Sequence, residues 1–129
     1  MRKYPRKVYA IFPYDKNGKA AGVYVGSSAN MKRRLINHRS SAPGQGNQDQ
    51  LHQLMRDNGC AYKFLDDISG IKENHVEYDW IDYFVKVSDF KVFNNFVNCH
   101  LADWTRISPD KINEAISDPL FFFGTRGGS

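Results

Sequence analysis

Hydrophobic and polar positions follow two spacings along the chain, one typical of strands and one typical of helices. Apolar, β-branched and aromatic residues fill positions 8–12, and a second such run over 22–26 has a glycine at each end. The Asn-Gly step between them favours a turn, so these two segments predict a β-hairpin with one tyrosine on each strand. Residues 62–68 predict a third strand of mixed pattern, and residues 90–96 predict another strand or an extended segment near the core.

Apolar residues three and four positions apart predict four helices, over residues 31–39, 49–58, 74–87 and 109–117. Serine and asparagine side chains before the first and last of these helices can cap their N-termini, and Gly59 ends the second. An apolar run follows the last helix and must pack somewhere. The pattern as a whole indicates an α+β fold in which helices lie on a small sheet.

The chain has 129 residues, enough for one domain with a single hydrophobic core. Hydrophobic residues make up 41% and charged residues 25%, which excludes the disordered and fibrous classes. No stretch approaches the roughly 20 apolar residues of a membrane helix, and no apolar signal core follows the basic start, so we expect a cytoplasmic protein, in the host cytoplasm if the chain is viral. Cys60 and Cys99 form no pattern of a zinc cluster or a disulfide scaffold.

Positive charge is concentrated at the start of the chain. The first 39 residues hold ten Lys and Arg and a single acid, whereas the other 90 residues hold eight bases and thirteen acids. A basic region on an acidic body is typical of a protein that binds a polyanion, because each neutralised phosphate releases condensed counterions. Nucleic acid is therefore the partner that the charge favours.

One carboxylate stands at an unusual place on the longest predicted helix. The apolar stripe of this helix consists of Val76, Trp80, Ile81, Phe84 and Val87. Glu77 falls on the same arc, whereas we expect Asp79 and Asp82 on the opposite, solvated arc. A buried isolated charge costs several kcal/mol, so Glu77 needs a metal ion or an arginine as a partner. Glu73, one turn earlier, is the alternative acid.

Four further side chains have types that suit phosphodiester hydrolysis. Tyr9 and Tyr24 lie on adjacent antiparallel strands and can face the same way, and Arg34 and His38 stand four residues apart on one side of a helix. This chemistry needs an activated water, positive charge beside the pentacovalent phosphate, and carboxylate oxygens for a hard cation. A tyrosine can act as the base only if a nearby cation stabilises its anion.

The order and spacing of these residues resemble the GIY-YIG endonuclease family, in its homing and restriction-like branch. The resemblance is carried by Tyr9, Tyr24, Gly26, Arg34 ten residues after Tyr24, His38 four residues further, Glu77, and Asn94 after Val92-Phe93. It covers residues 7–97. The first motif reads Lys7-Val8-Tyr9 and lacks the family's glycine, which carries no catalytic group.

The resemblance implies a small antiparallel three-stranded sheet flanked by helices, and a metal-dependent DNA endonuclease. By this likeness Glu77 binds one divalent cation, Mg2+ or Mn2+, and Arg34 stabilises the transition-state phosphate. Tyr9 or Tyr24 activates or orients the water, a choice that the sequence leaves open, and His38 assists proton transfer. Asn94, with Asn95 as an equal candidate, steadies the site or contacts the nucleic acid. Four basic residues are expected to contact nucleic acid: Lys7, Lys32, Arg33 and Arg39.

The resemblance divides the chain into a nuclease domain, residues 1–97, and a C-terminal extension, residues 98–129, that packs on the core or serves as an interface. Homing enzymes of the family usually carry a separate DNA-reading domain, so here a removed domain, a partner protein or low specificity are alternatives. A monomer and a homodimer both fit, as do nicking and double-strand cleavage. The rival interpretations are an inactive nucleic-acid-binding module, a restriction or repair nuclease of the same family, and a protein-interaction domain such as a phage accessory protein.

Overall fold

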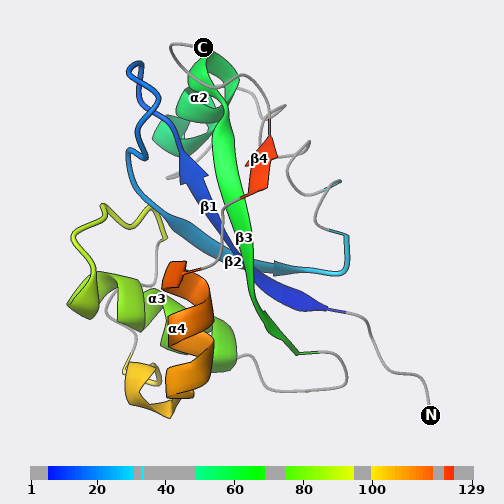
Figure 1. Ribbon diagram of the computed structural model, residues 1–129, viewed down its shortest axis with the longest axis vertical. Coiled ribbons are helices and arrows are strands. Elements are labelled where there is room, and N and C mark those ends of the chain that lie inside the picture. Colours follow the sequence, from blue (N-terminus) through cyan, green and yellow to red (C-terminus); the bar gives the residue numbers. More distant parts are fainter. Residues whose placement is uncertain are drawn as a thin grey trace.

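The computed structural model describes residues 6–30, 33, 49–68, 75–94, 100–117 and 121–123. Its centre is an antiparallel sheet with strand order β2-β1-β3-β4 (Figure 1). Three strands make up most of it, β1 (Lys7–Pro13), β2 (Tyr24–Ser28) and β3 (Cys60–Asp67). The short β4 (Phe121–Phe123) pairs with the start of β3, so the apolar run after the last helix joins the sheet. The α+β class with a small antiparallel sheet is confirmed.

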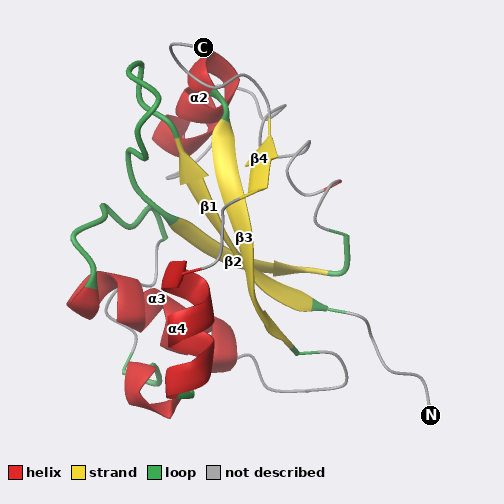
Figure 2. Ribbon diagram, in the orientation of Figure 1, coloured by secondary structure: helices red, strands yellow, loops and turns green. Residues whose placement is uncertain are grey.

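Helices lie at both ends of this sheet (Figure 2). The first described one, α2 (Asp49–Asn58), lies where β1 ends and β3 begins. The long α3 (His75–Val87) and α4 (Pro109–Ser117) lie near each other away from α2, with a 3-10 turn, η1 (Trp104–Arg106), between them in the chain. The predicted bounds of α2 and α4 are those observed, and α3 agrees over all of its described residues.

The two faces of the sheet bury different sets of side chains, because successive residues of a strand point to opposite faces. One set packs with α3 and forms the α3 face: Val8, Ala10, Phe12, Val23 and Val25 with Trp80, Ile81 and Phe84. The other set packs with α2 and forms the α2 face: Tyr9, Ile11 and Tyr24 with Leu51, Met55 and Cys60. Each strand of the hairpin therefore divides its side chains between two small cores.

Short-range signals in the sequence set several element ends. Gly59 has φ 79° and its N–H donates to Met55 O, which is the left-handed cap expected after α2. Asn30 Oδ1 accepts from Arg33 N at 3.1 Å, so the expected asparagine cap stands at the start of a helical turn. At α4, Ser108 Oγ accepts from Lys111 N at 3.4 Å. These three ends are fixed by contacts within four residues.

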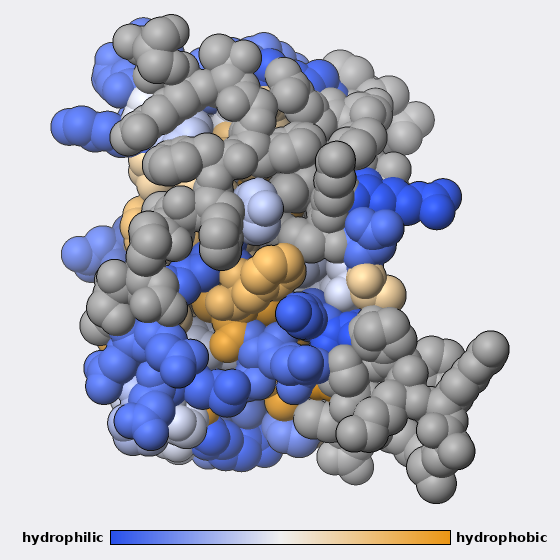
Figure 3. Space-filling view, turned by 45° about the vertical axis from the view of Figure 1, so that its right-hand side comes forward, coloured by the Kyte–Doolittle hydropathy of each residue, from blue (hydrophilic) through white to orange (hydrophobic). Residues whose placement is uncertain are grey.

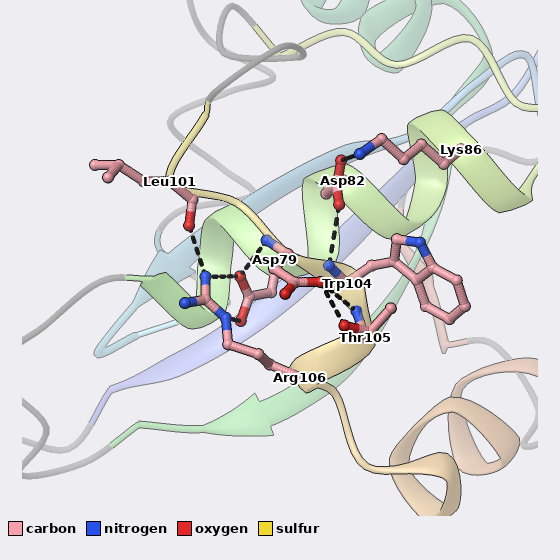
Figure 4. A network of polar contacts seen from close by, with 8 residues as sticks. Asp79, Asp82, Lys86, Leu101, Trp104, Thr105 and Arg106 are labelled. Atoms are coloured by element: carbon pink, nitrogen blue, oxygen red, sulfur yellow. Dashed lines mark hydrogen bonds and ion pairs between the residues drawn. The ribbon is translucent and has the colours of Figure 1, made fainter.

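The predicted solvated arc of α3 is wrong. Asp79 and Asp82 are only 3% and 4% exposed, whereas Val87, expected on the apolar stripe, is 49% exposed. The reason is a covering segment far along the chain: residues 101–106 lie over this side of α3 and bind both carboxylates (Figure 4). Each of these two buried carboxylates therefore accepts hydrogen bonds from this covering segment.

Residues after the predicted domain boundary contact the core. Ile107 is buried among the residues of the α3 face, and Lys63 of β3 donates from its buried ammonium to Glu114 O of α4. Lys111 forms an ion pair of 3.1 Å with Asp66. In Figure 3 the described surface is mainly hydrophilic, with an apolar area near the middle of the view. Among the described residues, no helix is long and apolar enough to span a membrane.

Candidate functional site

The two motif tyrosines meet at one glycine. Tyr9 stands directly opposite Gly26 in the β1–β2 ladder, and Tyr24 lies two residues before Gly26 on the same strand. A Cβ added to Gly26 would lie 2.6 Å from Tyr9 Oη and 3.1 Å from Tyr24 Cε1. Both phenol rings therefore lie on the α2 face and close over the space left by the missing side chain, as expected from the hairpin.

These phenols are largely enclosed. Tyr9 is 1% exposed and Tyr24 is 7% exposed, and both belong to the cluster with Leu51 and Met55 of α2. Helix α2 thereby fixes the positions of the two rings from the other side. Little of either ring is therefore open to a ligand that lies over the sheet.

Glu77 lies beside the residue that follows this glycine. Ser27 Oγ donates to Glu77 Oε2 at 3.5 Å, a long hydrogen bond, and accepts from Arg6 Nε at 3.1 Å. Glu77 is half-buried in the first turn of α3, where a carboxylate also interacts favourably with the helix dipole. The expected inward acid thus has a hydroxyl partner from β2, and the same hydroxyl binds an arginine.

The tyrosines and the acid approach β2 from different sides. Ser27 stands opposite Val8, a residue of the α3 face, while Gly26 stands opposite Tyr9 on the α2 face. Strand β2 is at the edge of the sheet, so the two groups can act on one ligand only around that edge, near the end of the strand. The structure places a carboxylate and two phenols at consecutive residues of β2, on opposite faces.

Asn94 binds the outer edge of β2 through both ends of its amide. Nδ2 donates to Val25 O at 2.7 Å and Oδ1 accepts from Val25 N at 2.9 Å. Immediately before it, Phe93 N donates to Val23 O, and Val92 forms a parallel bridge with Val23. The expected extended segment therefore runs along β2, and Asn94 is a positioning residue for the strand that carries Tyr24 and Gly26.

Other predicted site residues fall in two groups. Arg34, His38, Lys32 and Arg39 lie outside the described residues. Arg33 is described as exposed and helical. Lys7 is exposed at the start of β1, and its ammonium lies 5.0 Å from the centre of the Phe64 ring.

The donor set for a cation is small in the described part of the chain. No group of three or more His, Cys, Asp or Glu side chains is close enough together there to hold a metal ion. Glu77 supplies one carboxylate, and the Ser27 hydroxyl beside it is a second oxygen. Hard oxygens of this kind suit Mg2+, which takes one or two protein ligands and keeps several waters.

Asp79 and Asp82, the two acids of α3 that the sequence analysis expected in solvent, are buried and bound by other residues (Figure 4). Asp79 accepts from Arg106 Nε and Nη2 at 3.1 and 2.6 Å and from Asp103 N at 2.9 Å. Asp82 accepts from Trp104 N at 3.0 Å and pairs with Lys86 Nζ at 3.0 Å. We name this set the α3 clamp. It ties residues 103–106 to the helix that carries Glu77, at positions two and five residues after this acid.

Hydrogen bonds within and beside the α3 clamp shift the pKa values of two residues. The pKa of Arg106 is raised, first by its hydrogen bond to Asp79. The pKa of Asp103 is lowered, first by the hydrogen bond from the Thr105 hydroxyl and then by the Thr105 N–H. The charged forms of Arg106 and Asp103 are therefore favoured in the folded chain.

Comparisons of the chain with protein-family models, with curated proteins and with solved structures find no match.

Proposed function

We propose that this chain is a metal-dependent DNA endonuclease of the GIY-YIG type that hydrolyses phosphodiester bonds. The observation that supports the proposal best is the meeting of Tyr9 and Tyr24 over Gly26, with Glu77 bound to the next residue, Ser27. A tyrosine pair packed in a hairpin is common, but a pair that requires a glycine beside it, next to a serine that binds an acid, is a more specific arrangement.

The proposed roles follow from what each side chain can do. Glu77 and Ser27 offer oxygens at the edge of β2, where Glu77 would hold one divalent cation. When bound, Mg2+ or Mn2+ supplies positive charge that polarises the phosphate and favours ionisation of a water. Tyr9 or Tyr24 orients or deprotonates the attacking water, while Asn94 keeps β2 in register through Val25.

Arg34 and His38, which lie outside the described residues, complete the proposal from the helix that the sequence predicts over residues 31–39. Arg34 would place its positive charge beside the phosphate oxygens, where negative charge increases in the transition state. His38 would assist the proton transfers. Lys7, Lys32, Arg33 and Arg39 would contact backbone phosphates, which fix the position of DNA without reading its sequence.

The test is cleavage of supercoiled plasmid and of single-stranded DNA by the full chain with Mg2+ or Mn2+. We expect metal-dependent cleavage that falls at least about 100-fold in Glu77→Gln and in Arg34→Ala. Glu114→Gln, an exposed acid on α4, and Arg56→Ala on α2 are the matched controls and should cleave as the unchanged chain does.

Two outcomes would contradict the proposal. Cleavage that persists unchanged in Glu77→Gln would remove the proposed site. Salt-sensitive DNA binding without metal-dependent cleavage of any of these substrates would instead indicate a binding module, since counterion release accompanies phosphate contact whether or not a bond is cut.

A further inference from the structure

An exposed aromatic ring continues the row of residues at the proposed site. Tyr9 of β1 stands opposite Gly26 on one side and opposite Phe64 of β3 on the other. Neighbouring strands are about 4.8 Å apart, so Phe64 lies one strand beyond Tyr9 and about 10 Å from Gly26. Yet Phe64 is 39% exposed, whereas Tyr9 is almost fully buried.

The position of α2 explains this difference. Helix α2 lies at the end of the sheet where β3 begins, and it packs on Tyr9 through Leu51 and Met55. Phe64 stands level with Tyr9 in the sheet but one strand away, on β3, and it is not part of the cluster that α2 covers. The α2 face is thus covered over the tyrosine and open to solvent at Phe64.

Two neighbours hold the Phe64 ring and give it a charge environment. Tyr62, on the same strand and face, contacts it edge to face with ring centres 6.0 Å apart. Lys7, two residues before Tyr9, places its ammonium 5.0 Å from the ring centre. A fixed exposed ring beside a cation suits a group that has both a flat apolar surface and a negative charge.

We propose that Phe64 and Lys7 form a stacking site for one unpaired base of a DNA strand, next to the phosphodiester at Gly26. This inference rests on the proposed function for the choice of DNA as the ligand. An exposed aromatic side chain on an antiparallel sheet can stack on an unpaired base, while a base inside a duplex is already stacked on its neighbours. Lys7 would contact the adjoining phosphate, in agreement with the excess of Lys and Arg over acidic residues in the first 39 residues.

The proposal has a consequence for the substrate class. A DNA strand with unpaired bases beside the cut, such as a single strand or a flap, should bind better than a fully paired duplex of the same sequence. The preference should depend on Phe64, because base–aromatic stacking accounts for about a 5- to 100-fold change in affinity for each base.

The experiment measures binding of the full chain to a fluorescent 12-nucleotide single strand and to its duplex, in EDTA so that no strand is cut. Phe64→Ala should weaken single-strand binding about 5- to 100-fold and leave duplex binding within about twofold. Phe90→Ala is the matched control, because Phe90 is 41% exposed and its ring packs on Phe12 of the α3 face. Phe64→Trp should restore affinity, and its added fluorescence should be quenched by the single strand.

Equal affinity of Phe64→Ala and the unchanged chain for the single strand would overturn the inference, as would an equal loss on single strand and duplex. The cleavage assay separates this failure from failure of the proposed function. Cleavage with no dependence of binding on Phe64 rejects only the stacking site. Phe64-dependent binding of the single strand without cleavage rejects only the nuclease.

Discussion

The side-chain amide of Asn94 binds Val25 as a neighbouring strand would, with one donor and one acceptor on the same residue. The partners are 69 positions apart in the chain, so this pairing fixes a distant segment to the edge of β2. Val25 lies between Tyr24 and Gly26. Asn94 therefore supports the geometry of the two tyrosines through the main chain of the residue next to Tyr24.

Asn94→Ala should lower the free energy of unfolding by about 1–3 kcal/mol, because the N–H and C=O of Val25 lose their partners in a half-buried place. Asn94→Asp should be destabilising at pH 7 as well, since a carboxylate can accept from Val25 N but repels Val25 O. Urea denaturation measures both. Asn113→Ala, at an exposed position of α4, serves as the control. If Asn94→Ala unfolds at the same urea concentration as the unchanged chain, the positioning role of Asn94 is contradicted.

Gly26→Ala should be destabilising by about 1–3 kcal/mol and should reduce cleavage. The new Cβ would lie 2.6 Å from Tyr9 Oη and 2.8 Å from Tyr9 Cζ, so the ring must move. The double variant Tyr9→Phe with Gly26→Ala should recover part of the stability, because the closest clashing atom is gone. If the single variant unfolds like the unchanged chain and the double variant gains nothing, the rings do not close over Gly26.

Arg106→Ala should lower the free energy of unfolding by about 1–3 kcal/mol, because it leaves the buried Asp79 carboxylate with only part of its hydrogen bonds. Arg106→Lys should recover only part of the loss, since an ammonium cannot reproduce the two-pronged contact. Lys86→Ala removes the exposed partner of Asp82 and should cost less than about 1 kcal/mol. Thermal denaturation of the three variants measures these losses of stability. A larger loss of stability in Lys86→Ala than in Arg106→Ala would contradict the prediction.

The pH dependence of the α3 clamp follows from Asp103, whose pKa is lowered by the hydroxyl of Thr105. Because the folded pKa lies below the unfolded one, this carboxylate contributes stability above the unfolded value, and the contribution is lost as pH falls through the folded value. Thr105→Val should move the pKa of Asp103 up towards its ordinary value of 3.8, whereas Thr105→Ser should not. A carboxyl titration by NMR measures the shift, and an unchanged pKa in Thr105→Val would exclude the hydroxyl as the cause.

Much of the fold was predictable because it depends on local patterns. The hairpin, α2 and its glycine cap, and α4 follow from strand alternation, helical spacing and capping residues within a few positions. The shared face of Tyr9 and Tyr24 also follows from alternation once the register is known.

What the sequence did not predict depends on contacts between distant segments. Asp79 and Asp82 were expected in solvent because nothing near them in the chain indicates a cover, yet residues 103–106 bind them from more than twenty positions away. The twofold amide contact of Asn94 and the exposure of Phe64 depend likewise on how separate elements pack. The nuclease assignment itself remains a prediction from residue order, which the experiments above test.

The segment that ends in Asn94 also decides how copies of this chain can associate. Its main chain and amide occupy the outward N–H and C=O groups of Val23 and Val25, which an exposed edge strand would offer to a neighbour. A continuous intermolecular sheet through this stretch would first have to displace residues 91–94. A dimer of this chain would therefore have to form at another surface, and this stretch of the β2 edge is protected against strand addition.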